Sequence, residues 1–317
     1  MNTRLLKIVF LLPLLSSCTS TGPASFSFEF PGDDSFNVPP VKIVAERGGF
    51  IPEGIEFDNL NNRFLTGSLA DGTIYEITYD GQLVPAFTSD DLVSTVGIEV
   101  DEPRNRLLVA NSDRGSATGA AMLGVYDLDS GSQLAMIDLT TSIPDKPADS
   151  NHFANDVAVS TAGAVFVTDS RQGIVYKVDR YYRVSILVNF GSDSSFGLNG
   201  LEYHPAGYLI LVSPGTGELI KVPVDNPDNW SVVELDYPAT GGDGLVWASD
   251  GSLASISNNS SNVSKYRSDD NWRSARLVAM ASFEGQATTG AVVGDDIYVV
   301  QPHFGDAEPP VILRAEF

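Results

Sequence analysis

The sequence has very few of the residues that build disulfide scaffolds or zinc sites. Its 317 residues include one Cys and three His, which excludes a disulfide framework and argues against a Cys/His zinc centre. Basic residues are also scarce, with 19 Lys and Arg against 41 Asp and Glu and a formal net charge of -22. Phosphate backbones repel a chain of this charge, so nucleic acid is not an expected partner.

Long apolar runs and helical periodicity are missing as well. Hydrophobic residues make up 43% of the chain, enough for a sizeable core. Beyond the N-terminal segment, however, no apolar run reaches the length of a transmembrane helix, and no window of a dozen residues has helical spacing. The sequence instead contains many short apolar runs bounded by Gly, Asp, Asn and Pro. These runs predict an all-β fold.

The single cysteine, Cys18, ends a segment with the features of a signal peptide. Residues 1–17 begin with basic side chains and continue with an apolar run over 8–15 that is too short to span a bilayer. The sequence Leu-Ser-Ser-Cys at 15–18 resembles the bacterial lipobox, whose cysteine is lipidated; an ordinary secretory signal is the alternative. An Asp after Cys18 would resemble an inner-membrane retention signal, but residue 19 is Thr. We expect an exported lipoprotein at the outer membrane, facing the periplasm and contacting the membrane only through its anchor.

A short motif recurs along the rest of the chain. Its copies are separated by 43, 59, 44, 44 and 46 residues, and they begin at Glu53, Val96, Asn155, Asn199, Asp243 and Thr289. Each copy precedes a turn and a second apolar strand, and the longest step carries extra loop around 114–121 and 141–150. Repeats of about 40–50 residues with three or four strands are typical of propeller blades. The sequence therefore predicts a six-bladed β-propeller.

The repeats also set the domain limits. Residues 18–40 are rich in Ser, Thr, Gly and Pro, which predicts a tether. Residues 41–317 are predicted to form one propeller domain. The strands at 41–44 and 311–313 lie outside the complete repeats, and we expect them to share a blade, so that no sheet edge is left open.

The first residues of the repeats are expected to converge on the mouth of the central channel. Four of the six are oxygen donors: Glu53, Asn155, Asn199 and Asp243. A buried ring of such groups needs a partner, and Ca²⁺ takes six to eight oxygen ligands. The set lacks His and Cys, which argues against zinc. We predict a divalent metal site of the Ca²⁺ type; the alternative is that the Asn-Gly and Asp-Gly pairs only form turns.

Four motifs link these positions to a known family. They are Pro52-Glu53-Gly54, Ala154-Asn155-Asp156-Val157 followed by Val167-Thr168-Asp169-Ser170, Leu198-Asn199-Gly200-Leu201, and Gly242-Asp243-Gly244-Leu245. With them the chain resembles the gluconolactonase–regucalcin family of six-bladed propellers, including proteins called calcium-dependent phosphotriesterase-like. The resemblance implies that Glu53, Asn155, Asn199 and Asp243 bind the metal. It also implies hydrolysis of lactones or related esters, in which Asp243 takes a proton from water activated by the metal.

Two positions depart from the family pattern. Sugar-lactone members carry an Arg two residues before Asn155, where this chain has Phe153, and paraoxonases place a His where this chain has Val96. These differences argue against a polar sugar lactone and against a paraoxonase-type His mechanism, and Phe153 favours an apolar or aromatic ester or lactone as substrate. His152, Phe153, Asp156 and His303 are the further candidates for the substrate pocket.

The leading hypothesis is therefore a metal-dependent hydrolase. The alternative is a non-catalytic, metal-stabilised propeller that binds a protein or glycan at the cell envelope. A lyase of the strictosidine synthase type is disfavoured by the intact set of metal ligands.

Overall fold

The computed structural model describes residues 38–113, 115–116, 119–147, 150–192, 197–305 and 308–317. The predicted signal peptide, the lipidation site Cys18 and most of the predicted tether lie outside the described residues. Pro39–Phe317 form one compact unit, and the Tyr298 hydroxyl donates a 2.9 Å hydrogen bond to the Pro39 carbonyl. Within the described part of the chain, no helix is long and apolar enough to cross a membrane.

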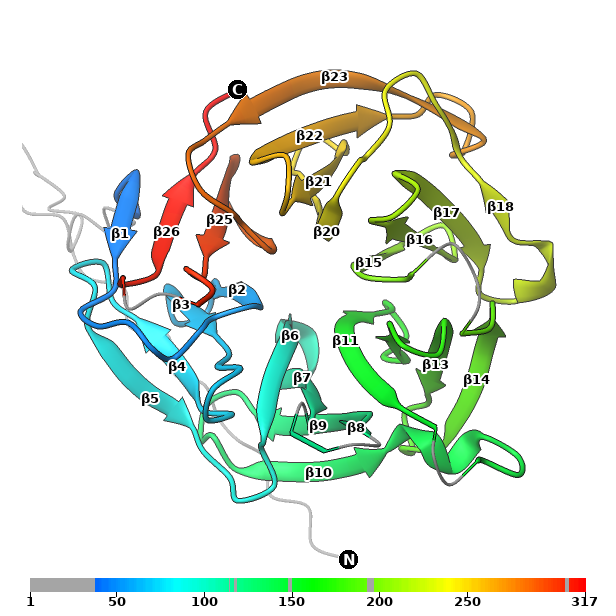
Figure 1. Ribbon diagram of the computed structural model, residues 1–317, viewed down its shortest axis with the longest axis horizontal. Coiled ribbons are helices and arrows are strands. Elements are labelled where there is room, and N and C mark those ends of the chain that lie inside the picture. The colour runs from blue at the N-terminus through cyan, green and yellow to red at the C-terminus, as the bar shows by residue number, and fades with distance from the viewer. Residues whose placement is uncertain (1–37, 114, 117–118, 148–149, 193–196, 306–307) are drawn as a thin grey trace, which may run out of the picture. The chain divides into compact units, whose positions relative to one another are not determined.

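Six sheets form a ring, and their innermost strands surround its centre (Figure 1). The predicted six-bladed propeller is confirmed. Blade 1 contains β2 (Ile55–Asp58), β3 (Arg63–Thr66), β4 (Ile74–Ile77) and β5 (Leu83–Phe87). Blade 2 contains β6 (Ser94–Asp101), β7 (Arg106–Ser112), β9 (Met122–Asp127) and β10 (Gln133–Asp138). Blade 4 contains β15 (Leu201–His204), β16 (Tyr208–Ser213), β17 (Glu218–Pro223) and β18 (Ser231–Val232).

Blades 3 and 5 each gain a short parallel strand. Blade 3 contains β11 (His152–Val159), β12 (Val165–Asp169), β13 (Ile174–Val178) and β14 (Val184–Asn189), with β8 (Gly119–Ala120) beside β11. Blade 5 contains β20 (Gly242–Trp247), β21 (Leu253–Ser257), β22 (Asn262–Arg267) and β23 (Ser274–Ser282), with β19 (Glu234–Leu235) beside β23. Three 3₁₀ turns complete the described secondary structure: η1 (Glu102–Arg104), η2 (Leu139–Ser142) and η3 (Pro227–Asn229).

Blade 6 closes the ring with strands from both ends of the propeller sequence. Three of its strands are β24 (Gly290–Val293), β25 (Asp296–Gln301) and β26 (Val311–Arg314). The fourth is β1 (Lys42–Val44), which pairs antiparallel with β26 so that Ile43 lies opposite Ile312. The prediction that these two segments share a blade is confirmed. The pairing covers the edge of the last sheet.

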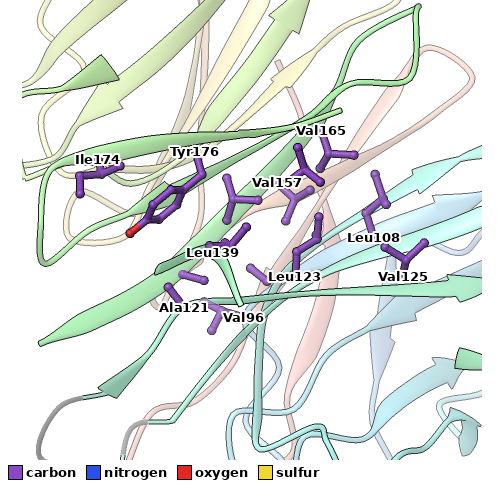
Figure 2. Close-up of a cluster of buried hydrophobic side chains, with 14 of the residues drawn as sticks. Val96, Leu108, Ala121, Leu123, Val125, Leu139, Val157, Val165, Ile174 and Tyr176 are labelled. Atoms are coloured by element: carbon purple, nitrogen blue, oxygen red, sulfur yellow. The ribbon is translucent and has the colours of Figure 1, made fainter. Parts of the chain in front are cut away.

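The core lies between the blades. Six clusters of buried apolar side chains occur in the described part of the chain, each formed by two neighbouring blades. Figure 2 shows the cluster between blades 2 and 3, where Leu108 and Val125 of one sheet face Val157 and Val165 of the next. Because each sheet is covered on both faces, its central strands are buried with little alternation between the two faces. All seven residues of β7 are buried for this reason.

The longest repeat step supplies extra structure between blades 2 and 3. Gly119 of β8 pairs with His152 at the start of β11, and Leu139 of η2 is buried in the interblade cluster. The backbone N–H of Leu139 donates to the Ala121 carbonyl at 3.0 Å. These insertions therefore pack onto the propeller and line a space beside the start of β11.

Candidate functional site

The repeat starts meet in a ring around the channel, and the glycine that follows five of the six starts explains why they can. A Cβ on Gly97 would lie 2.7 Å from the Asn155 carbonyl oxygen, and one on Gly200 would lie 3.0 Å from the Gly244 Cα. The Gly244 N–H donates to the Thr288 carbonyl at 2.8 Å, and the Thr288 hydroxyl donates to the Glu53 carbonyl at 2.6 Å. Only a residue without a side chain fits such a close approach of neighbouring strands.

β-Bulges occur at three of the six repeat starts. The pairing register shifts between Thr95 and Ile98 in β6, between Ala154 and Val157 in β11, and between Gly242 and Leu245 in β20. Val96, Asn155 and Asp243 lie inside these bulges, which re-aim side chains at the ends of strands. The glycines after Asn199 and Asp243 do not have positive φ. A left-handed turn therefore does not account for the Asn-Gly and Asp-Gly pairs.

Asp243 is hydrogen-bonded at both of its carboxylate oxygens. Its side chain is 9% exposed. The Asn199 amide donates a short hydrogen bond to Asp243 Oδ1, and Asn258 Nδ2 donates to Oδ2 at 2.9 Å. Burial raises the pKa of Asp243 to about 6, and the two amide hydrogen bonds partly oppose this shift. Asn258 was not predicted from the sequence, although it follows β21 directly within the run Ser-Asn-Asn.

The other two predicted ligands, Asn155 and Glu53, belong to blades 3 and 1. Asn155 is buried in β11, and its neighbour Thr168 donates from Oγ1 to the Asn199 carbonyl at 2.9 Å, joining blades 3 and 4. Glu53 precedes β2 and is half-buried. Within the described residues, no three His, Cys, Asp or Glu side chains gather as a metal site. The predicted ring has only two carboxylates, so this observation does not test it. Its oxygen donors and its buried carboxylate fit a hard cation.

Asp156 takes the place that glycine has in the other repeats. Its Oδ2 accepts from the Leu201 N–H at 3.0 Å, and its own N–H donates to Thr168 Oγ1 at 3.1 Å. Burial raises the pKa of Asp156 to about 7, against the effect of the backbone donors. The Asp156 carboxylate therefore links β11 to β15. This is a structural role, separate from the place in the substrate pocket that the sequence predicts for it.

Phe153 is half-buried, and an arginine stands over it. The Arg171 guanidinium carbon lies 5.0 Å from the centre of the Phe153 ring, and Arg171 Nη1 donates to the His152 carbonyl at 3.4 Å. Sequence reasoning missed Arg171 because it belongs to the turn between β12 and β13, far from the repeat start. A cation thus lies close to the position where the resembled family carries an arginine.

The two candidate histidines are placed differently. His152 opens β11 and is 3% exposed, hydrogen-bonded at Nδ1 to Asp169 (2.7 Å) and at Nε2 to Ser150 (2.9 Å). His303 follows β25 with a φ of 54° and has Nδ1 3.4 Å from Glu308 Oε2. The structure therefore places His152 inside blade 3 rather than in a surface loop. It places His303 in the loop after β25, next to Glu308 of the same loop.

A second acidic group lies further along the channel. It consists of three glutamates that each follow a repeat start by three residues: Glu56, Glu99 and Glu202. This spacing is visible in the sequence, but a group of the three was not predicted from it. They line a cavity of about 280 Å³ together with Trp247 and Glu102. Burial in the channel raises the pKa of all three well above the ordinary glutamate value. Neighbouring carboxylates add to the effect: Glu202 on Glu56, Glu56 on Glu99, Glu99 on Glu202, and Asp156 on each.

This group should make the stability of the propeller depend on pH. Because the folded pKa values are raised, stabilisation is fully present below the unfolded value of about 4.3 and is lost as pH rises through the folded values. Glu99→Gln should therefore raise the melting temperature at pH 8 in EDTA and flatten its pH dependence, by about 2–4 °C for each kcal/mol recovered. Besides Glu56 and Asp156, Asp101 raises the pKa of Glu99.

Glu234→Gln is the matched control, since it removes the same charge from an exposed position on β19. It should change the melting temperature little at any pH. Equal effects of the two substitutions would mean that net charge, rather than burial in the channel, sets the pH dependence.

Comparisons with known proteins support the fold. No family model and no curated protein sequence matches the chain. Among solved structures, the allergen Mala s 1 of Malassezia sympodialis is 16% identical with a TM-score of 0.72, covering 87% of this chain and 96% of the allergen. Regucalcin from Agrobacterium tumefaciens, described as a calcium-binding protein, is 18% identical with a TM-score of 0.61 (86% and 95% covered).

A luciferin-regenerating enzyme is 13% identical with a TM-score of 0.60, covering 86% of this chain and 93% of the enzyme. At these identities, the likeness is one of fold. The resemblance to regucalcin-type six-bladed propellers that the repeat motifs indicated is confirmed at that level.

Proposed function

We propose that the protein is a metal-dependent hydrolase of lactones or related esters, with its active site at the channel mouth. The observation that carries this proposal is the buried Asp243 carboxylate, which accepts hydrogen bonds from two neutral amides within the ring of repeat starts. A buried carboxylate in such surroundings favours a bound cation. Two structural neighbours, a calcium-binding regucalcin and a luciferin-regenerating enzyme, are consistent with this proposal.

The residues of the ring would divide the work. Glu53 and Asp243 would offer carboxylate oxygens, and Asn155 and Asn199 would offer amide oxygens. A divalent cation, Ca²⁺ in our proposal, polarises a carbonyl or phosphoryl oxygen and lowers the pKa of water when it is bound. Asp243 would accept a proton from water, and Asn258 would keep its carboxylate from rotating. Asp156 would hold blades 3 and 4 together beneath the substrate.

A hydrolysis screen tests this proposal. Alkyl lactones, sugar lactones and aryl esters should be assayed with EDTA, and then after Ca²⁺, Mn²⁺ or Zn²⁺ is added back. We expect lactone hydrolysis, and any ester hydrolysis that is lost in Asp243→Asn, to disappear in EDTA and to return with Ca²⁺. Lactone hydrolysis that persists in EDTA and is lost in Asp243→Asn would contradict metal dependence. Metal binding without hydrolysis of any ester or lactone would favour the non-catalytic, metal-stabilised propeller.

Phe153 should set the preference for apolar substrates. We expect kcat/KM for an alkyl lactone to exceed that for a sugar lactone by at least about tenfold, since one well-packed apolar side chain contributes about 1.5–3 kcal/mol. Phe153→Ala should reduce this ratio toward one. Phe283→Ala, a half-buried phenylalanine between blades 5 and 6, should leave the ratio unchanged. A wild-type preference for the sugar lactone would overturn the assignment.

A further inference from the structure

Blade 3 contains a hydrogen-bonded chain of three side chains away from the ring of repeat starts. Ser150 Oγ lies 2.9 Å from His152 Nε2, and His152 Nδ1 lies 2.7 Å from Asp169 Oδ2. Asp169 is fully buried and His152 is 3% exposed, whereas Ser150 is half-buried. The order hydroxyl, imidazole, carboxylate is the one that activates serine nucleophiles.

The surroundings of Asp169 fix the tautomer of the imidazole. Asp169 Oδ1 accepts from the Phe153 and Arg171 N–H groups at 3.0 and 3.2 Å, and Oδ2 accepts from the Tyr176 hydroxyl at 3.2 Å. In neutral His152 the proton therefore lies on Nδ1, facing the carboxylate, and Nε2 is an acceptor. Ser150 Oγ is the donor on that side. Its hydrogen is shared with the Pro147 carbonyl, which lies 2.8 Å away.

In other blades, the corresponding link between the second strand and the segment that enters the blade uses neutral side chains. At the end of the second strand or just after it, Ser68 donates to the Phe50 carbonyl, Ser257 to the Thr240 carbonyl and Gln301 to the Glu284 carbonyl. Each of these bonds ties the second strand to the segment that enters its blade. A neutral hydroxyl or amide is thus enough to tie the second strand to the segment that enters the blade. That structural link does not explain why blade 3 has a carboxylate–imidazole pair at this position.

The serine and the histidine open onto a cavity. It has a volume of about 150 Å³ and is lined by Ser150, His152, Thr140 and Lys146, among others. A cavity of this size holds a molecule about as large as benzene, which corresponds to a short acyl group. Lys146 Nζ donates to Thr140 Oγ1 at 2.8 Å, so an ammonium group lies in the wall of the same cavity.

We propose that Ser150, His152 and Asp169 form a second reactive site that takes short acyl groups from esters. Ser150 Oγ bonds to the acyl carbon while its proton moves to His152 Nε2, and the ester C–O bond breaks as that proton passes to the leaving alkoxide. Water then attacks the acyl-serine, gives a proton to His152 Nε2, and releases the carboxylic acid as the proton returns to Ser150. Asp169 orients the imidazole throughout.

A fluorophosphonate probe tests the site directly. Ser150 Oγ would displace fluoride from phosphorus, and the adduct would be located by intact mass and peptide mapping on the full folded chain in EDTA. We expect one adduct, on Ser150. His152→Gln should slow its formation by about 10²–10⁴-fold, the usual contribution of a general base, and Ser150→Ala should abolish it. Ser142→Ala is the control, because its hydroxyl donates to the Leu139 carbonyl without a histidine nearby.

Two results would overturn the proposal. One is a folded wild-type protein that forms no adduct at Ser150. The other is an adduct whose rate is unchanged in His152→Gln, which would mark Ser150 as an ordinary exposed hydroxyl. Because EDTA is present throughout, both results are distinguishable from failure of the proposed metal site.

Discussion

Asp243→Asn should lower kcat for metal-dependent ester or lactone hydrolysis by about 10²–10⁴-fold, even at saturating metal. The substitution keeps the size of the side chain and one oxygen, but it removes the charge and the proton acceptor. It also places an NH₂ group against a neighbouring amide donor, since Asn199 and Asn258 each donate to a different oxygen of Asp243. Steady-state kinetics over a range of Ca²⁺ concentrations provide the measurement.

Two further variants separate metal binding from proton transfer. Asn199→Ala should mainly weaken metal binding, because it removes an amide oxygen but leaves Asp243. Activity should be partly recovered at high Ca²⁺. Asp228→Asn, in the exposed turn η3, should behave like the wild type. If Asp243→Asn kept wild-type kcat at saturating Ca²⁺, Asp243 would not be the proton acceptor.

Gly200→Ala should strongly destabilise the fold. A Cβ there would overlap the Asp243 carbonyl oxygen and lie 3.0 Å from both the Gly244 Cα and the Leu245 nitrogen. All three atoms are backbone, so no flexible side chain can move aside. We expect a loss of about 3 kcal/mol or more in the free energy of unfolding, at the upper end for overpacked sites. Denaturant unfolding monitored by circular dichroism would measure it.

Gly115→Ala is the control for this prediction. Its Cβ would find its nearest neighbour at 3.4 Å, from Asp113 Oδ1, which is ordinary contact. Its stability should stay within about 0.5 kcal/mol of the wild type, as at most surface positions. A Gly200→Ala protein as stable as Gly115→Ala would mean that the inner strands do not approach as closely as described.

The blade architecture could be predicted because it repeats. Six copies of one motif at nearly equal steps require six similar units, and the β1–β26 closure followed from apolar runs left over at both ends of the repeats. The glycines were harder to interpret. Gly200 and Gly244 were weighed as turn formers, whereas the structure uses them where strands of adjacent blades nearly touch.

Side chains that reach the site from outside the repeat phase could not be predicted in this way. Arg171 stands over Phe153 because a turn between two later strands folds back on β11, a contact that no spacing encodes. Ser150 comes from the insertion of the longest repeat step, and its partner Asp169 ends a different strand. Sequence periodicity locates what repeats, whereas these contacts depend on loops present in a single blade.

The most direct test of the account is a calorimetric titration of Ca²⁺ into the EDTA-stripped protein, with thermal melts of the same samples. The ring of Glu53, Asn155, Asn199 and Asp243 predicts one bound cation per chain. It also predicts a melting temperature that rises with Ca²⁺, since a ligand selective for the native state stabilises it. Asp243→Asn should bind the cation much more weakly. An unchanged melting temperature in EDTA, together with equal binding by wild type and Asp243→Asn, would contradict a shared cation site at the channel mouth.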